Sequence, residues 1–154
     1  MRYRSRNYFI DALKAETLAK KYSTPLYCYS FKRLRNNIIN FKKSFKVINP
    51  IICFAVKANS NRTILREIGK LGLGADVVSI GELIKALRSG IKPNKIVFSG
   101  VGKTEDELKY AIRKKILLIN TESESEVFTI EKIAKKERKV VDVGIRINPN
   151  TDAK

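Results

Sequence analysis

A length of 154 residues, with 44% hydrophobic and 31% charged residues, is typical of one folded globular domain. The net charge of +17 is spread over every expected helix without interleaved aromatic residues, a pattern that argues against a specific nucleic-acid partner. No apolar run reaches the length of a membrane span and no secretion signal opens the chain, so we expect a cytoplasmic protein without membrane contact.

The first strong periodicity begins at Ser30. Apolar residues then recur at helical spacing and predict an amphipathic helix; they are Phe31, Leu34, Ile38, Phe41 and Phe45. Residues 51–56 form a short continuous apolar run, which is typical of a strand buried on both faces in a parallel sheet. A second helix is expected over residues 64–71. Gly72 suits the left-handed position that closes a helix, so the helix is expected to end there.

The same alternation continues along the chain. Strands are expected over residues 75–78, 96–98, 116–119 and 140–147. Each helix between them begins with a serine or threonine followed three residues later by a glutamate, the pattern of a capping box. These pairs are Ser79 with Glu82, Thr104 with Glu107 and Ser123 with Glu126. Regular alternation of strands and helices implies right-handed crossovers and a parallel sheet.

The sequence therefore predicts an α/β fold, either doubly wound or closed as a barrel, and the periodicity does not choose between the two. A dinucleotide site is disfavoured because no glycine-rich fingerprint opens the first crossover, and residues 100–104 only imitate a phosphate loop. Cys28 and Cys53 lie in apolar segments away from metal-ligand spacing, so buried thiols and no metal site are expected. An eight-fold barrel needs about 250 residues, and the five units expected here would be part of one in a larger protein.

Three polar residues stand at the carboxyl ends of expected strands, where the mouth of a parallel barrel opens. Lys57 directly follows the apolar run 51–56, and a desolvated amine loses its proton readily and becomes a nucleophile for a carbonyl carbon. Strand alternation, if it continues to Lys57, points its side chain inward. Asp76 and Arg146 each interrupt another apolar strand. The alternative interpretation is structural, because a single lysine at a strand end more often points to solvent and single charges more often form salt bridges.

Several blocks of the sequence resemble a known family. Residues 54–59, Phe-Ala-Val-Lys-Ala-Asn, resemble the cofactor-lysine motif of the fold type III pyridoxal-phosphate enzymes. Further blocks are similar, in family order, to those of the diaminopimelate decarboxylases; they are residues 74–83, 98–104, 120–126 and 146–149. Residues 18–27 are similar to the start of that family, so the resemblance covers essentially the whole chain.

The resemblance implies an incomplete (β/α)8 barrel of the alanine racemase type, about five units long, over residues 30–154. It implies that residues 1–29 are a lead-in that in the family contributes to a second β-domain. Lys57 would then carry pyridoxal 5'-phosphate as a Schiff base, with Asp76 in the cofactor pocket and Arg146 beside the ring hydroxyl. The implied reaction, in lysine biosynthesis, is decarboxylation of meso-2,6-diaminopimelate to L-lysine and carbon dioxide by a homodimer.

The resemblance also leaves alternatives open. The family has a ring-stacking histidine, a glycine-rich phosphate loop and a β-domain, whereas this chain has no histidine, so the chain alone is expected to be inactive. The nearest alternative is a decarboxylase of the same group that acts on ornithine, arginine or carboxynorspermidine. A non-catalytic protein that binds pyridoxal phosphate, and a basic nucleic-acid-binding module, are the others.

Overall fold

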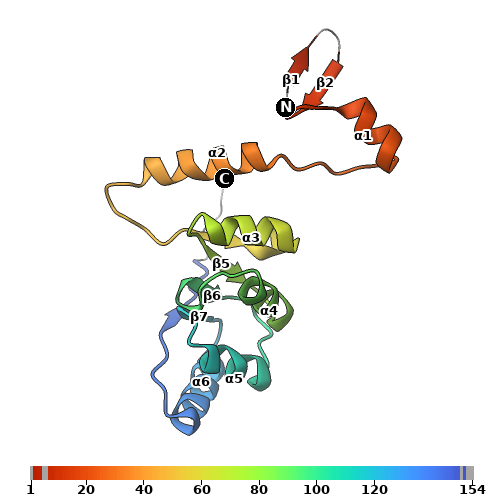
Figure 1. Cartoon of the computed structure of the whole chain (residues 1–154). Helices are drawn as coiled ribbons and strands as arrows, with labels where there is room; N and C mark the ends of the chain where they lie inside the picture. Colours follow the sequence, from red (N-terminus) through yellow and green to blue (C-terminus); the bar gives the residue numbers. More distant parts are fainter. Residues whose placement is uncertain (1, 5–6, 150, 152–154) are drawn as a thin grey trace. The chain divides into compact units, whose positions relative to one another are not determined.

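The computed structural model describes residues 2–4, 7–149 and 151 of the chain. Internal contacts divide the chain into two compact units, Met1–Pro50 and Ile51–Lys154 (Figure 1). None of the helices in the described part is both long and apolar enough to span a bilayer.

The first unit begins with a small antiparallel sheet in the order β1-β2-β3 and continues with two helices. These elements are β1 (Arg2–Arg4), β2 (Asn7–Ile10), β3 (Leu13–Lys14), α1 (Ala15–Tyr22) and α2 (Phe31–Ser44). Helix α2 is the amphipathic helix predicted from the sequence, and it ends one residue before Phe45. The sheet was not predicted, because strands of two to four residues are too short to show a period.

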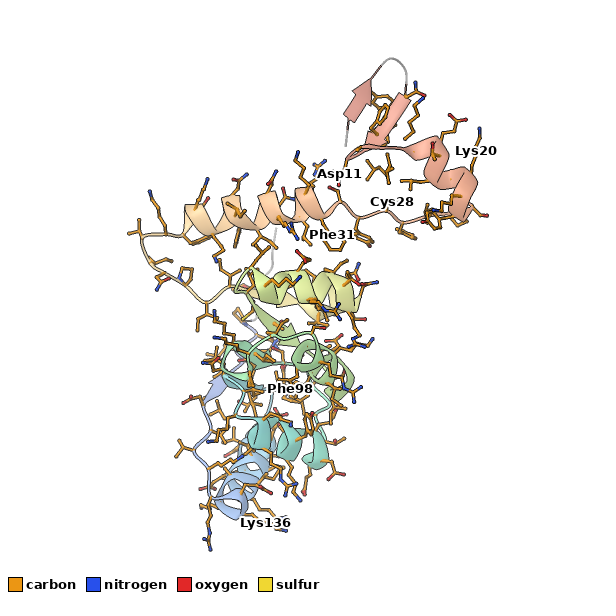
Figure 2. All side chains as sticks on the ribbon, viewed as in Figure 1. Asp11, Lys20, Cys28, Phe31, Phe98 and Lys136 are labelled. Carbon is orange, nitrogen blue, oxygen red and sulfur yellow. The ribbon has the colours of Figure 1, made fainter. Side chains whose placement is uncertain are left out.

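A single hydroxyl ties the turn of this sheet to the start of α2. Asp11 sits between β2 and β3 with a φ of 55°. Its two carboxylate oxygens accept hydrogen bonds from Ser30 Oγ at 2.7 and 2.8 Å (Figure 2). Ser30 is also the N-cap of α2, where its Oγ accepts the amide of Arg33 at 3.1 Å. The buried Ser30 side chain therefore satisfies one exposed amide of the helix and anchors the turn.

The second unit is a parallel sheet whose strands follow chain order, β4-β5-β6-β7-β8. The strands are β4 (Cys53–Ala55), β5 (Gly74–Val77), β6 (Ile96–Phe98), β7 (Leu118–Thr121) and β8 (Val143–Ile145). The crossovers carry α3 (Arg62–Lys70), α4 (Ile80–Arg88), α5 (Glu105–Lys114) and α6 (Glu124–Glu137), with short 3-10 turns η1 (Val56–Ala58) and η2 (Pro93–Lys95). Sequential strands that pair in parallel with a helix between them confirm the predicted α/β partial barrel.

Four predicted strands have different limits in the structure, and the smallest difference is at β5, which begins and ends one residue before the expected 75–78. The runs 51–56 and 140–147 shorten to the three-residue strands β4 and β8. The run 116–119 becomes β7, two residues later, because its register is set by pairing Val97 with Leu118 on the neighbouring strand. A continuous apolar run does not mark which of its residues join the ladder.

One face of this sheet packs against the helices and forms the core. Alternate residues on it have no exposed surface; they are Ala75, Val77, Ile96, Phe98 and Ile119. The register places Val77, Phe98 and Ile119 side by side across three strands, and Phe98 lies in the interior of the unit (Figure 2). Each such side chain contributes roughly 1.5–3 kcal/mol by leaving water. This helix-facing face holds the sheet in place and leaves the opposite, inner face for chemistry.

The predicted capping pairs are present at all three helix starts. The full box forms at Thr104, where the side chains of Thr104 and Glu107 each accept the other residue's amide. Ser79 and Ser123 also accept the amide three residues on. Their glutamates, however, accept the amide one residue before the cap, at Val78 and Glu122, so these two boxes are one residue wider than predicted.

Candidate functional site at the carboxyl ends of the strands

Lys57 lies just beyond the end of β4. The strand stops at Ala55, and η1 then turns the chain, with the amide of Asn59 bonded to Val56 O at 3.1 Å. Val56 is fully buried, whereas the side chain of Lys57 is exposed. Lys57 therefore lies in the 3-10 turn and not in the strand, so strand alternation does not set the direction of its side chain, which is exposed in the part of the chain that the structure describes. Among those residues the Lys57 amine has no hydrogen-bond or ion-pair partner.

Asp76 lies on the inner face of β5, one residue before the strand ends. It pairs in register with Ala55 on β4, so Lys57 stands two residues beyond the partner of Asp76, on the adjacent strand. Its carboxylate Oδ1 accepts a hydrogen bond from Ser99 Oγ at 2.7 Å. The structure thus brings Lys57 and Asp76 to neighbouring strand ends.

Beneath this carboxylate lies the thiol of Cys53. Burial, together with the negative charge of Asp76, raises the pKa of Cys53 above its ordinary value. The thiol donates weakly to Lys95 O, at 3.6 Å. Gly74 leaves room for the sulfur, because a Cβ at that position would lie 2.9 Å from it. Cys53 is therefore a neutral packing group and not a nucleophile.

Two further residues complete a polar row across three strands. Ser99 directly follows β6, and Asn120 lies on β7. Asn120 Nδ2 donates to Ser99 Oγ at 3.0 Å, and Ser99 donates in turn to Asp76. On β8 the neighbour of Asn120 is Gly144, where any Cβ would overlap Asn120 Oδ1. Ser99, Asn120 and Gly144 were not identified from the sequence as site residues.

The signal for Ser99 and Asn120 was nonetheless present. Each is a polar residue that directly follows an apolar run, 96–98 or 116–119, as Lys57 follows 51–56. Polar groups in that position lie at the open end of a parallel sheet. Gly144 gave no such signal, because its role depends on contact with a neighbouring strand.

Arg146 lies at the far side of the row. It follows β8, and its amide donates to Thr121 O at 3.0 Å. Its guanidinium is half exposed, 3.4 Å from Glu122 Oε1, and also donates to Asn148 Oδ1 at 3.2 Å. Three strand spacings separate β5 from β8, on the order of 14 Å along the sheet. The structure therefore places Arg146 on the same strand ends as Asp76 but not in contact with it.

The lysine of the loop at residues 100–104, which imitates a phosphate loop, is held by contacts within the protein. Lys103 has only 1% of its side chain exposed and forms an ion pair with Glu126 Oε1 at 2.8 Å. Its ammonium also donates to Gly100 O and lies 5.9 Å from the centre of the Phe98 ring. A lysine held in this way is not presented to a phosphate, in agreement with the sequence analysis.

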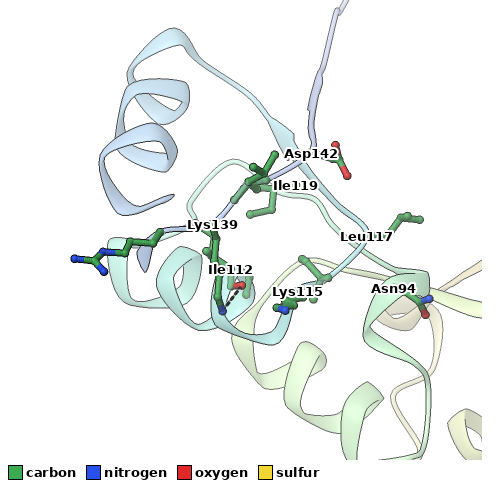
Figure 3. Close-up of a pocket in the computed structure, with 12 residues that line it drawn as sticks. Asn94, Ile112, Lys115, Leu117, Ile119, Lys139 and Asp142 are labelled. Carbon is green, nitrogen blue, oxygen red and sulfur yellow. Dashed lines mark hydrogen bonds between the residues drawn. The ribbon is translucent and has the colours of Figure 1, made fainter. Parts of the chain in front are cut away.

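A cavity of about 480 Å³ lies at the opposite ends of the strands (Figure 3). Residues that precede β7 and β8 line it, among them Leu117 and Asp142. Lys139, one of its lining residues, donates from Nζ to Ile112 O at 3.2 Å, near the end of α5 (Figure 3), and also to Arg113 O at 2.9 Å. Because capping of the carboxyl end of α5 explains these contacts, and the barrel mouth lies at the other end of the strands, the cavity is not part of the candidate site.

The residues at the barrel mouth fit an aldehyde cofactor with a charged ring. Lys57 offers an amine with no partner among the described residues, which suits capture of a carbonyl carbon. Asp76, Ser99 and Asn120 offer a connected polar row, and Ala55 and Gly144 are small residues beside it. A lysine, an aspartate and an arginine at the strand ends of a partial parallel barrel are compatible with an enzyme that holds its cofactor through a lysine.

Comparison with known proteins identifies the family. A family model described as "Pyridoxal-dependent decarboxylase, pyridoxal binding domain" matches residues 31–154, so the chain belongs to this family. A diaminopimelate decarboxylase of Helicobacter pylori (strain J99) is 50% identical over 90% of this chain and 34% of its own length.

Two solved structures agree with this assignment. Diaminopimelate decarboxylase of M. jannaschi has a TM-score of 0.92 and 38% identity, over 99% of this chain and 37% of that one. The Helicobacter pylori enzyme complexed with L-lysine has a TM-score of 0.85 and 47% identity, over 90% and 35%. The chain therefore spans about a third of the length of these relatives. The family match begins at residue 31, whereas the two compact units divide after Pro50, so the expected limits of the lead-in stay a prediction.

Proposed function

We propose that this chain supplies the cofactor-bearing lysine, and part of the cofactor pocket, of an enzyme that decarboxylates meso-2,6-diaminopimelate to L-lysine and carbon dioxide. The observation that carries the proposal is the place of Lys57, in the turn that follows β4 and one strand from Asp76. It occurs in a chain of the pyridoxal-dependent decarboxylase family that aligns with a diaminopimelate decarboxylase over 90% of its length.

Each proposed residue has a role that follows from its chemistry. Pyridoxal phosphate supplies an electron-accepting ring when carbon dioxide leaves. Lys57 would hold this group through its amine, which is a nucleophile for the aldehyde carbon. Asp76 places a negative charge one strand from that amine and stabilises positive charge there. Arg146 offers a planar donor to an anionic oxygen, and its contact with Glu122 orients it.

The remaining parts of the proposal concern the whole protein. We expect a cytoplasmic homodimer in which residues 1–29 belong with a second β-domain. The groups that select the substrate are expected in the two thirds of the relatives that this chain does not span. Alone, the 154-residue chain is expected to release no carbon dioxide.

A chimera tests the role of Lys57 directly. Residues 1–154 replace the aligned segment of the Helicobacter pylori diaminopimelate decarboxylase, which shares half of its residues with this chain. Reduction with borohydride fixes the cofactor to the amine that holds it, and mass spectrometry of the digested protein then locates it. We expect the modified residue to be Lys57, and Lys57→Ala to abolish both the modification and carbon dioxide release.

The matched control is Lys92→Ala, which removes an exposed lysine side chain that has no hydrogen-bond or ion-pair partner among the described residues. It should leave both measurements unchanged. Modification of a different lysine, or full turnover by Lys57→Ala, would contradict the assignment. Assays with meso-diaminopimelate, ornithine, arginine and carboxynorspermidine on the natural full-length protein separate the proposed substrate from the alternatives.

A further inference from the structure

We propose that Ser99 and Asn120 are positioning residues: they fix the orientation of the Asp76 carboxylate and act through it on cofactor capture by Lys57. This inference rests on the proposed function and adds two residues to it. The three side chains come from three consecutive strands and form one hydrogen-bonded row.

The row has a single direction because of the donors available. A serine hydroxyl has one hydrogen to donate. Ser99 Oγ accepts the amide hydrogen of Asn120 at 3.0 Å, so its own hydrogen is directed to Asp76 Oδ1 at 2.7 Å. An amide that holds a hydroxyl, which in turn holds a carboxylate, fixes the rotation of all three groups.

The backbone makes the row possible. Pairing of Phe98 with Ile119 sets Ser99 level with Asn120 on the inner face. Asp76 pairs with Val97, one pleat earlier, so Ser99 reaches back to it. On the other side Gly144 pairs with Asn120 and has no Cβ to displace the amide. The amide is therefore confined between a glycine and a hydroxyl.

The row does not serve the core of the protein. Its members are only partly buried, whereas the core residues Val77, Phe98 and Ile119 lie on the opposite face with no exposed surface. Water at the open end of a sheet would satisfy the same polar groups, so the row is not needed to avoid an unsatisfied group. A fixed arrangement is what a binding site gains from it.

The arrangement also leaves one carboxylate oxygen available. Among the described residues, Asp76 Oδ1 accepts from Ser99 and Oδ2 has no partner. Lys57 lies two residues beyond Ala55, the register partner of Asp76. An anchored Oδ1 thus sets the direction of the free Oδ2 relative to a group held by the lysine.

The test compares Ser99→Thr with Ser99→Val in the chimera described above. Threonine keeps the hydroxyl, and valine has the same shape without it. The measurement is the fraction of Lys57 modified after borohydride reduction, as a function of the concentration of pyridoxal phosphate. We expect Ser99→Val to need about tenfold more cofactor for half modification, the value of one hydrogen bond to a charged group, and Ser99→Thr to stay within about twofold of the parent.

Two further variants separate positioning from a general loss of structure. Asn120→Ala should weaken capture by a smaller factor, about threefold, because the hydroxyl then rotates freely. In an Asp76→Ala background, which removes the acceptor of the Ser99 hydroxyl, Ser99→Val and Ser99→Thr should capture the cofactor equally, because residues that act through one another are not additive. Thermal unfolding of each variant, followed by circular dichroism, shows whether it is folded.

The outcomes are distinct. Equal capture by the threonine and valine variants in the parent background overturns the inference and leaves the proposed function standing. A difference that persists in full without the Asp76 carboxylate shows that Ser99 does not act through it, and also overturns the inference. No capture at Lys57 even in the parent chimera overturns the proposed function, and the inference with it.

Discussion

Near the carboxyl ends of its central strands, the two faces of the five-stranded sheet carry different side chains, which are apolar and buried on one face and polar and partly exposed on the other. On the helix-facing face, Val77, Phe98 and Ile119 are neighbours in register and have no exposed surface. On the inner face, one residue further along two of the same strands, Ser99 and Asn120 are partly exposed and joined by a hydrogen bond. On each of these strands, one position therefore contributes to the core and the next lies at the candidate site.

The difference follows from the period of two along a strand. A one-residue step moves a side chain from the apolar layer to the mouth of the barrel. The apolar layer fixes the strands, and the fixed strands then hold polar groups at set distances without needing those groups for folding. Changes on the two faces should therefore have separate effects, on the free energy of unfolding and on cofactor capture.

The largest effect is expected on the helix-facing face. Phe98→Ala removes a fully buried ring from the centre of the core and should lower the free energy of unfolding by about 3–5 kcal/mol. Asn120→Ala, on the inner face of the adjacent strand, should lower it by about 1 kcal/mol or less. Urea denaturation measures both. Equal losses in the free energy of unfolding would show that the inner face contributes as much to stability as the helix-facing face.

The next effect concerns the buried ion pair between Lys103 and Glu126. Lys103→Met leaves the carboxylate of Glu126 without its cation and should cost about 3 kcal/mol. Lys135→Met is the matched control, because its pair with Glu131 has a similar length, 2.7 Å, but both side chains are exposed. Exposed pairs contribute about 0–1 kcal/mol. A control loss as large as the test loss would mean that burial does not decide the value of the pair.

The sequence predicted the helix-facing face well. Apolar runs separated by capped helices indicated a parallel sheet, without its strand order, and Phe98 and Ile119 lie in two of those runs. Hydrophobic period and helix caps are local signals, so one sequence is enough to detect them. The same signals located Lys57 at the end of a strand, but not the 3-10 turn that exposes it.

The inner face was predicted in part, for a physical reason. Asp76 was identified because a charge between apolar residues is visible in one strand. Its link to Ser99 and Asn120 depends on the register of three strands, and register is set by contacts between segments about twenty residues apart. The bond from Ser30 to Asp11, nineteen residues apart, was missed for the same reason.

A smaller effect sharpens the comparison at the point where β8 meets the row. Gly144→Ala places a methyl group against Asn120 Oδ1 and should displace the amide. We expect a loss of about 1–2 kcal/mol in the free energy of unfolding, because a close contact in a packed sheet yields only by local shifts. Cofactor capture in the chimera should weaken as it does in Asn120→Ala. The control Gly102→Ala adds a methyl group where no atom lies within 4 Å, and should change neither measurement.

The smallest expected effect depends on pH and tests the contacts of Glu107 with amides at the starts of α5 and α4. The amides of Thr104 and Ile80 donate to the two oxygens of Glu107, at 3.0 and 2.9 Å. The Thr104 amide first, and the Ile80 amide as well, hold the pKa of Glu107 below its ordinary value. A carboxylate whose pKa is lower in the folded state stabilises the fold above its unfolded pKa, about 4.3, and this contribution is lost as the pH falls through the folded value.

Glu107→Gln should therefore lose about 1 kcal/mol at pH 7, the value of a helix cap, and progressively less below pH about 4. The measurement is urea denaturation of both proteins across this range. Glu105→Gln removes the same charge from the same turn of α5. The side chain of Glu105 has no hydrogen bond among the described residues. A difference from the parent that stays constant with pH, or that Glu105→Gln reproduces, would show that the two amide bonds of Glu107 are not its source.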